Sequence, residues 1–149
     1  IVYARHHNLS DERLLRALCV SNLIAIHQKT NVGRLSAYCG AVSAACGSGA
    51  AITYMLGGDY EQVSSTITNT LANVSGIICD GAKPSCAAKI ASSVEAAIIG
   101  HTLACESVTF KDGDGIVKSN VEETIDGVRT IASKGMRETD VTVLNVVIG

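Results

Sequence analysis

The sequence has very few large rings. It contains no Trp, one Phe and four Tyr among 149 residues, so aromatic residues make up only 3% of the chain. A chain of this length can bury a substantial core, but stacked aromatic side chains cannot be its main component. Fourteen Gly and many Ala and Ser stand in their place. We therefore expect a core in which backbones approach one another closely.

Charged residues are also scarce, at 17% of the chain. The formal net charge of -2 gives no sign of binding to nucleic acid or to an anionic membrane surface. The uncharged stretch 35–58 is long enough for a membrane helix, but its Gly, Ser, Cys and Tyr content favours a buried helix of a soluble protein. We expect neither a nucleic-acid partner nor a membrane segment.

The chain begins at Ile1, with no initiator Met and no signal-peptide pattern. We expect one single domain over residues 1–149 that is a fragment or processed piece of a longer protein. The six Cys are an even number, which would suit disulfides. The missing secretion signal and the self-sufficient core instead favour reduced thiols and a cytoplasmic location.

The apolar pattern and its breaks predict an all-α bundle of about five to six helices with small-residue packing. The expected helices are 11–29, 35–56, 60–74, 84–99, 120–133 and a final apolar segment, 141–148. Gly100 is expected to end the fourth helix. Residues 1–9 are expected to be solvated and 101–115 to form an irregular loop region, with a short strand at 107–111 as one reading of its pattern.

Two helix starts carry capping signals. Asp59 with Gln62, and Asn120 with Glu123, have the spacing of a capping box, in which each side chain bonds the backbone of the other residue. These pairs predict where the third and fifth helices begin.

The stretch 79–86 (CDGAKPSC) joins two long segments that are poor in charge. Two cysteines in a turn that contains Gly81 and Pro84 can converge on one point. Pro84 suits the first position of a helix, which places Cys86 in a first turn, where the helix dipole favours anions. With Cys39 upstream, these cysteines form a candidate site for one iron–sulfur cluster.

Other metal sites fit the cysteine spacing less well. Zinc fingers and ribbons use close Cys-x-x-Cys or Cys/His pairs, and the tightly spaced ferredoxin run is also absent. Cys46 would share a helix face with Cys39, so it is a rival fourth ligand, although we favour a buried core thiol. On spacing alone, a zinc-stabilised fold and a non-catalytic helical interaction module stay open.

Four stretches together resemble a known family. They are residues 33–42 (GRLSAYCGAV), 75–83 (SGIICDGAK), 113–118 (GDGIVK) and 135–140 (GMRETD). They resemble the alpha domain of the iron–sulfur-dependent L-serine dehydratases, and more closely the L-cysteine desulfidase branch of that family. The resemblance implies an all-helical catalytic domain and a [4Fe–4S] cluster held by three cysteines, which by motif are Cys39, Cys79 and Cys86.

The chain also departs from the family pattern. Serine dehydratases have a longer insert between the last two ligand cysteines and a Pro after the Cys-Asp pair, whereas Gly81 follows Asp80 here. This departure favours the desulfidase branch. The N-terminal half of the family, with its Cys-Thr-Glu-Pro motif, has no counterpart in the sequence. We therefore expect the C-terminal, cluster-binding part of a longer enzyme, inactive without the N-terminal domain or a companion subunit.

The resemblance implies a β-elimination. L-cysteine would yield pyruvate, ammonia and sulfide, and L-serine would yield pyruvate and ammonia. Three protein ligands would leave one iron open to the substrate. Arg34 or Lys83 would hold the substrate carboxylate, and Asp80 would act in catalysis or orient the turn, with a salt bridge or cap as the alternative for each. We expect Lys89 on the loop side of its helix, the general base outside this chain, and a homo-oligomer.

Overall fold

The fold is all-α in the computed structural model, which describes residues 1–33 and 36–149. Its helices are α1 (Val2–His6), α2 (Asp11–Lys29), α3 (Gly40–Met55), α4 (Tyr60–Val74), α5 (Cys86–Cys105), α6 (Val121–Thr130), the π-helix η1 (Ile131–Gly135) and α7 (Arg137–Ile148). The predicted all-α class is confirmed, and seven α-helices in the described residues are close to the expected five to six. None of these helices is both long and apolar enough to cross a membrane.

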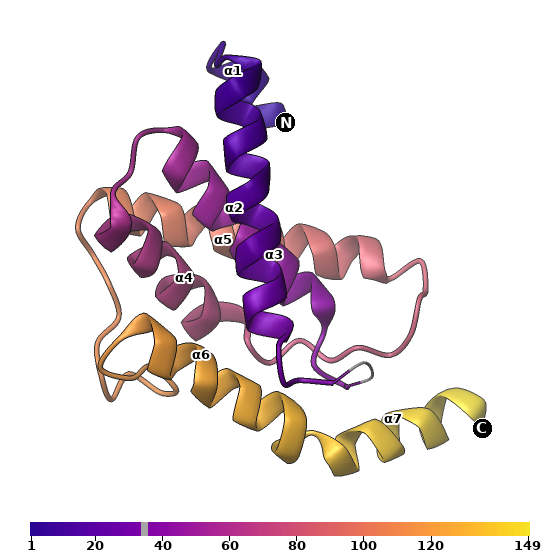
Figure 1. Cartoon of the computed structure of the whole chain (residues 1–149). Coiled ribbons are helices and arrows are strands. Elements are labelled where there is room, and N and C mark those ends of the chain that lie inside the picture. Colours follow the sequence, from indigo (N-terminus) through magenta and orange to yellow (C-terminus); the bar gives the residue numbers. More distant parts are fainter. Residues whose placement is uncertain (34–35) are drawn as a thin grey trace.

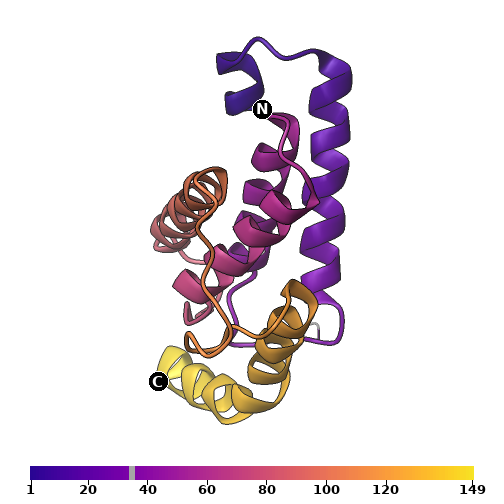
Figure 2. The ribbon, with the colours of Figure 1, turned by 90° about the vertical axis from the view of Figure 1, so that its left-hand side faces the viewer.

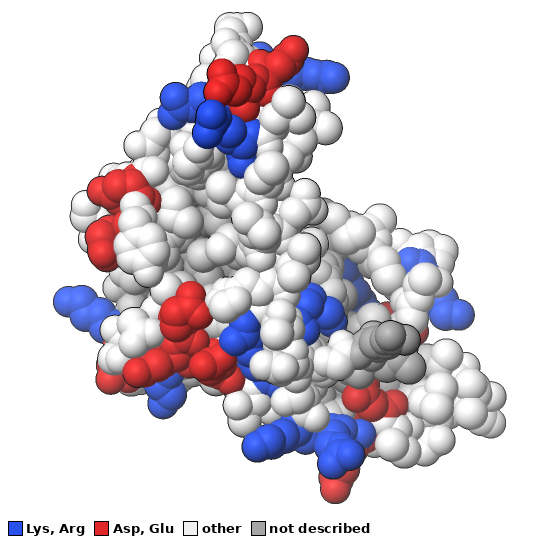
Figure 3. All heavy atoms as spheres, viewed as in Figure 1, with Lys and Arg blue, Asp and Glu red and all other residues white. Residues whose placement is uncertain are grey.

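Helix α3 is the centre of the bundle. It packs against α2, α4 and α5, and α4 also packs against α5 (Figure 1). The helix α6 closes one end of the bundle through α4 and α2, while α7 packs mainly on η1 (Figure 2). On the face in Figure 3, charged side chains gather near α1 and around α6, and the middle of that face is mostly uncharged.

Small residues lie where the helices cross, as the composition predicts. A Cβ on Gly47 of α3 would overlap the backbone oxygen of Ser21 in α2 and lie 3.3 Å from the amide nitrogen of Ala25. A Cβ on Gly49 would lie 3.0 Å from the Cβ of Ala97 in α5. Because these neighbours leave no room for a side chain, the helices contact one another almost backbone to backbone.

Gly100 does not end the fourth predicted helix, which was a wrong expectation. Helix α5 continues to Cys105, so residues 101–105 are helical and only the rest of 101–115 is irregular. A Cβ on Gly100 would lie 2.8 Å from the Thr70 hydroxyl and 3.0 Å from the Thr66 carbonyl oxygen of α4. Gly100 is therefore needed for close packing against α4. In the sequence alone, a glycine with this role looks the same as a glycine that ends a helix.

The segment 107–111 does not form the strand that its pattern allowed. The Asn69 side chain of α4 bonds it instead. The Asn69 amide donates to the Val108 carbonyl at 2.9 Å, and the Phe110 amide donates to the Asn69 oxygen at 3.0 Å. One side chain thus satisfies backbone groups that a partner strand would otherwise pair.

The N-terminal segment is not fully solvated, contrary to expectation. Residues 2–6 form α1, whose Ala4 is buried in a small second core with Ala17, Ile52 and Met55. The main core brings together α3, α4 and α6, with Val42, Leu71 and Ile125 among its most buried members.

The predicted caps are confirmed in one case and half confirmed in the other. Asp59 and Gln62 form the complete capping box at the start of α4. Asn120 accepts from the Glu123 amide at 2.9 Å, but the Glu123 carboxylate accepts from the Ser119 hydroxyl instead of bonding back to Asn120. Helix α6 then ends at Thr130, short of the expected boundary, and continues as η1.

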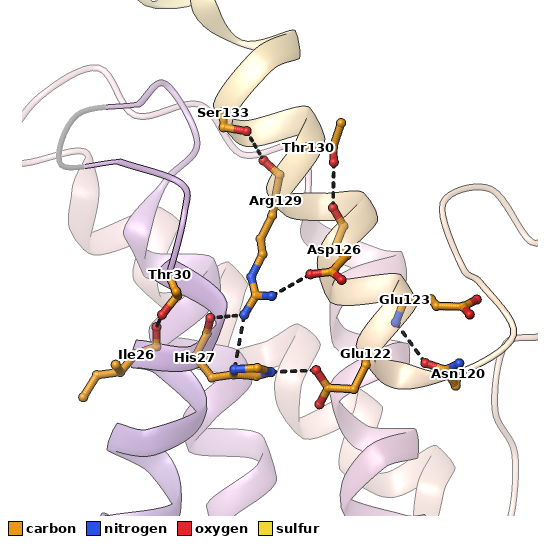
Figure 4. A network of polar contacts seen from close by, with 10 residues as sticks. All are labelled: Ile26, His27, Thr30, Asn120, Glu122, Glu123, Asp126, Arg129, Thr130 and Ser133. Carbon is orange, nitrogen blue, oxygen red and sulfur yellow. Dashed lines mark hydrogen bonds and ion pairs between the residues drawn. The ribbon is translucent and has the colours of Figure 1, made fainter.

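A polar network fastens α6 to the end of α2 (Figure 4). The Arg129 guanidinium donates to the His27 carbonyl, to His27 Nδ1 at 3.2 Å and to the Asp126 carboxylate at 2.6 Å. His27 Nε2 lies 2.7 Å from the Glu122 carboxylate. Because Arg129 donates to Nδ1, the ring proton sits on Nε2 and is donated to Glu122. The network fixes the end of the bundle beside the loop that precedes α3.

Candidate functional site

A short antiparallel bridge brings two of the predicted ligands together. It joins the segment before α3 to the segment after α4. The Cys79 amide donates to the Ala37 carbonyl at 2.7 Å, and the Cys39 amide donates to the Ile77 carbonyl at 3.1 Å. Two cysteines that are 40 residues apart in the sequence therefore lie on paired backbones.

The same bridge corrects the predicted start of α3. The helix begins at Gly40, and Cys39 is its N-cap residue, with extended backbone (φ −68°, ψ 124°). The bridge requires extended backbone on both sides, so the residues just before Gly40 cannot continue the helix. Cys39 and Cys46 consequently do not share a helix face as the sequence suggested.

Cys86 lies at the other end of the turn 79–86. Helix α5 begins at Cys86, two residues later than predicted, because Pro84 belongs to a turn in which the Cys86 amide donates to the Lys83 carbonyl at 2.9 Å. The Cys86 thiol bends back into this turn and donates to the Gly81 carbonyl at 3.3 Å. Gly81 has a φ of +89°, a conformation that glycine adopts without strain.

Cys39, Cys79 and Cys86 line one cavity of about 570 Å³. It lies between the start of α3, the turn 79–86 and the first half of α5. The rest of its wall is mostly small and apolar, and includes Ala41, Ala45, Ile90 and Val94. All three cysteines are free thiols. The structure thus brings the three predicted ligands to the wall of one open, mostly apolar cavity.

The described residues contain no preformed site for a single metal ion. Within residues 1–33 and 36–149, no three His, Cys, Asp or Glu side chains come close enough to hold one metal ion. In a four-iron cluster each cysteine binds a different iron, so its ligand sulfurs stand around the cluster and need not meet at a point. Three thiols spread around one cavity are compatible with that arrangement.

Lys89 lies on the loop side of α5, as expected. Its ammonium group donates to the Ile78 carbonyl at 2.9 Å and pairs with the Asp80 carboxylate. This hydrogen bond holds the pKa of Asp80 below its usual value and the pKa of Lys89 above its usual value. Asp80 is therefore engaged in an ion pair beside Cys79, which is the arrangement expected of a residue that orients the turn.

The structure does not place Lys83, another predicted catalytic residue, at the cavity. Lys83 is exposed on the turn and is absent from the cavity wall. Arg34 lies outside the described residues. Their roles stay predictions.

Cys46, the rival fourth ligand, is a core thiol. It is completely buried, away from the cavity, and lies 3.8 Å from the Ile67 carbonyl to which it donates. Burial raises its pKa to about 12.

The core next to Tyr38 contains a cluster of buried polar side chains that was not predicted from the sequence. Tyr38, Ser43 and Gln28 are buried around one small enclosed space, and their polar side-chain atoms have no hydrogen-bond partner within the described part of the chain. Burial raises the pKa of Tyr38. The position of Tyr38 directly before a predicted ligand was the only signal in the sequence.

We expect burial of the Cys46 thiol to make the protein less stable at alkaline pH. The folded state keeps the Cys46 proton up to about pH 12, whereas an unfolded thiol loses its proton near pH 9. Folding stability that is fully present below about pH 9 is therefore lost as pH rises toward about 12, by about 1.4 kcal/mol per pH unit for one proton. Urea unfolding at about pH 8 and about pH 10.5 measures the loss. Cys46→Ala should show a shallower slope, and a pH-independent midpoint in the unmodified protein would contradict the expectation.

Comparison with known proteins places this site in a family. The family model for the serine dehydratase alpha chain matches residues 1–145. The chain therefore belongs to the serine dehydratase alpha family, and the resemblance predicted from its motifs is confirmed.

Three similar relatives are bacterial and are named only as UPF0597 proteins. Those of Treponema denticola, Lachnoclostridium phytofermentans and Desulfitobacterium hafniense are 59%, 57% and 50% identical to this chain over 148 residues. These alignments cover 99% of this chain but only 34%, 36% and 34% of the relatives. The chain thus spans about a third of their length. No solved structure matches it significantly.

Proposed function

We propose that this chain is the cluster-binding part of a lyase that eliminates the β-substituent of L-cysteine, or of L-serine as the alternative substrate. Cys39, Cys79 and Cys86 would hold a [4Fe–4S] cluster. The observation that carries the proposal is that these three cysteines, distant in sequence, line one cavity in a chain of the serine dehydratase alpha family.

The residues of the chain suit this role. The cluster, when bound, would supply a Lewis-acidic iron that stabilises the departing sulfide or hydroxide. The cavity is open, so a small substrate can reach the three cysteines, and apart from Lys89 its wall carries no charged side chain in the described residues. The short turn with Gly81 after Asp80 favours L-cysteine as the substrate. Arg34 or Lys83 is proposed to bind the substrate carboxylate, and Asp80 is proposed to orient the turn.

The general base is proposed to come from outside this chain. No His is among the residues that line the cavity in the described structure, and the relatives are about three times as long as the chain. The remainder of such a polypeptide, or a companion subunit, would supply the base and the rest of the substrate site. A cytoplasmic location and a homo-oligomer remain predictions.

Anaerobic reconstitution with iron and sulfide tests the proposal. We expect about four iron and four sulfide per chain and a broad absorption band near 400 nm, typical of thiolate-to-iron charge transfer. Addition of L-cysteine should perturb the spectrum of the reconstituted protein, and D-cysteine should not. One bound zinc with no visible band would instead indicate a zinc-stabilised fold. Absence of both metals would indicate a helical interaction module.

A further inference from the structure

Lys89 is the one charged side chain on the described wall of the cysteine cavity. It projects from the first turn of α5, one turn after Cys86, so both residues lie on the same side of the helix. Its side chain is only 22% exposed, which is low for a lysine. A cation that is partly removed from water in an apolar cavity requires an explanation in terms of its neighbours.

Two of those neighbours flank a predicted ligand. The Lys89 ammonium donates to the carbonyl of Ile78 at 2.9 Å and pairs with the carboxylate of Asp80. These residues immediately precede and follow Cys79. Lys89 therefore joins the helix that begins with Cys86 to the backbone that carries Cys79.

The charge of Lys89 matters as well as its hydrogen bonds. Three thiolates make a cluster site anionic, and cluster properties depend on net charge and on hydrogen bonding around the ligands. The hydrogen bond to the Asp80 carboxylate favours the protonated form of Lys89 and raises its pKa. Lys89 thus presents a positive charge to the same cavity that the three cysteines line.

We propose that Lys89 is a positioning residue of the cluster site, which holds Cys79 in register with Cys86 and balances part of the negative charge of the bound cluster. The proposal rests on the proposed function and adds a residue to it. It gives Asp80 a defined part too, because Asp80 offsets the Lys89 charge and orients its ammonium group.

The reduction potential of the reconstituted cluster tests the charge. Lys89→Met removes a positive charge, so its potential should shift to more negative values than that of the unmodified protein. Asp80→Asn removes a negative charge at the same place, so its potential should shift to more positive values. The double variant should lie between the two. A role confined to loop packing would not produce shifts of opposite sign.

The retention of iron tests the positioning. Under anaerobic conditions with a chelator, Lys89→Met should lose iron about 10- to 100-fold faster, the usual consequence of removing an outer-shell partner of a metal site. Lys89→Arg should retain most of the iron because it keeps a cation and donors. Lys111→Met, on an exposed loop outside the cavity, is the matched control and should behave like the unmodified protein.

The outcomes separate the two proposals. If the unmodified protein takes up no cluster, both the proposed function and the role of Lys89 are wrong. If it takes up a cluster, and Lys89→Met retains iron and potential unchanged, only the role of Lys89 is wrong. Far-ultraviolet circular dichroism of each variant shows whether it is folded. If Lys89→Met does not fold, Lys89→Arg still tests the proposal.

Discussion

Replacement of any one of Cys39, Cys79 or Cys86 by Ser is expected to abolish incorporation of the cluster. A serine hydroxyl is a hard, poorly ionised donor, whereas iron–sulfur clusters select soft thiolates. With three protein ligands, the loss of one leaves too few bonds to hold the cluster. Iron and acid-labile sulfide per chain should fall to background after anaerobic reconstitution, and the band at about 400 nm should disappear.

Cys39→Ser is the most informative of the three. Cys39 is the N-cap residue of α3 and makes no side-chain hydrogen bond there. Serine is among the preferred N-cap residues and stabilises a helix start by about 0.5–2 kcal/mol relative to a non-capping residue. A capping bond would offset the cost of placing a hydroxyl at this buried position. The variant should therefore stay folded while it fails to bind iron, and urea unfolding beside the unmodified protein shows that loss of the cluster is not due to unfolding.

Two exposed cysteines provide the controls. Cys19 on α2 and Cys105 at the end of α5 are free thiols and do not line the cavity. Cys19→Ser and Cys105→Ser should take up iron as the unmodified protein does. An undiminished band in Cys39→Ser, Cys79→Ser and Cys86→Ser would show that the ligands have been wrongly assigned.

Elements with strong local signals were predictable from the sequence. The capping pair of Asp59 with Gln62 gave the start of α4, because that start depends on two side chains only three residues apart. The start of α3 was not predictable in this way. It is set by pairing between Cys39 and Ile77, which is a tertiary contact that no local pattern reveals.

In the candidate site, too, some features were predictable from local sequence and others depend on tertiary packing. The three cysteines that line the cavity were picked out by motif resemblance, and the position of Lys89 on the loop side followed from helical spacing. Which lysine reaches the cavity depends on how the turn is folded. Lys83 is closer in sequence to both neighbouring cysteines, yet it points to solvent, while Lys89 spans back to Asp80. Buried Gln28 and Ser43 approach Tyr38 only because α2, α3 and the preceding loop are packed together.

Gly47→Ala is expected to be among the most destabilising single substitutions in the chain. Its new methyl group would overlap the carbonyl oxygen of Ser21 and crowd the amide of Ala25, both in the backbone of α2. Backbone atoms cannot rotate aside as a side chain can, so α2 would have to move away from α3 along its length. Such overpacking costs about 1–3 kcal/mol or more, and the better helix propensity of Ala offsets only about 1 kcal/mol of it.

The measurement is thermal or urea unfolding of Gly47→Ala beside Gly127→Ala. Gly127 lies within α6, and its nearest neighbour to an added Cβ is the Ile116 carbonyl oxygen at 3.8 Å, an ordinary contact. That variant should gain about 0.5–1 kcal/mol, because Ala restricts the unfolded chain and favours the helix. The same chemical change should therefore have opposite effects at the two glycines. Equal stability of Gly47→Ala and the unmodified protein would mean that α2 and α3 do not approach as closely as the small residues between them require.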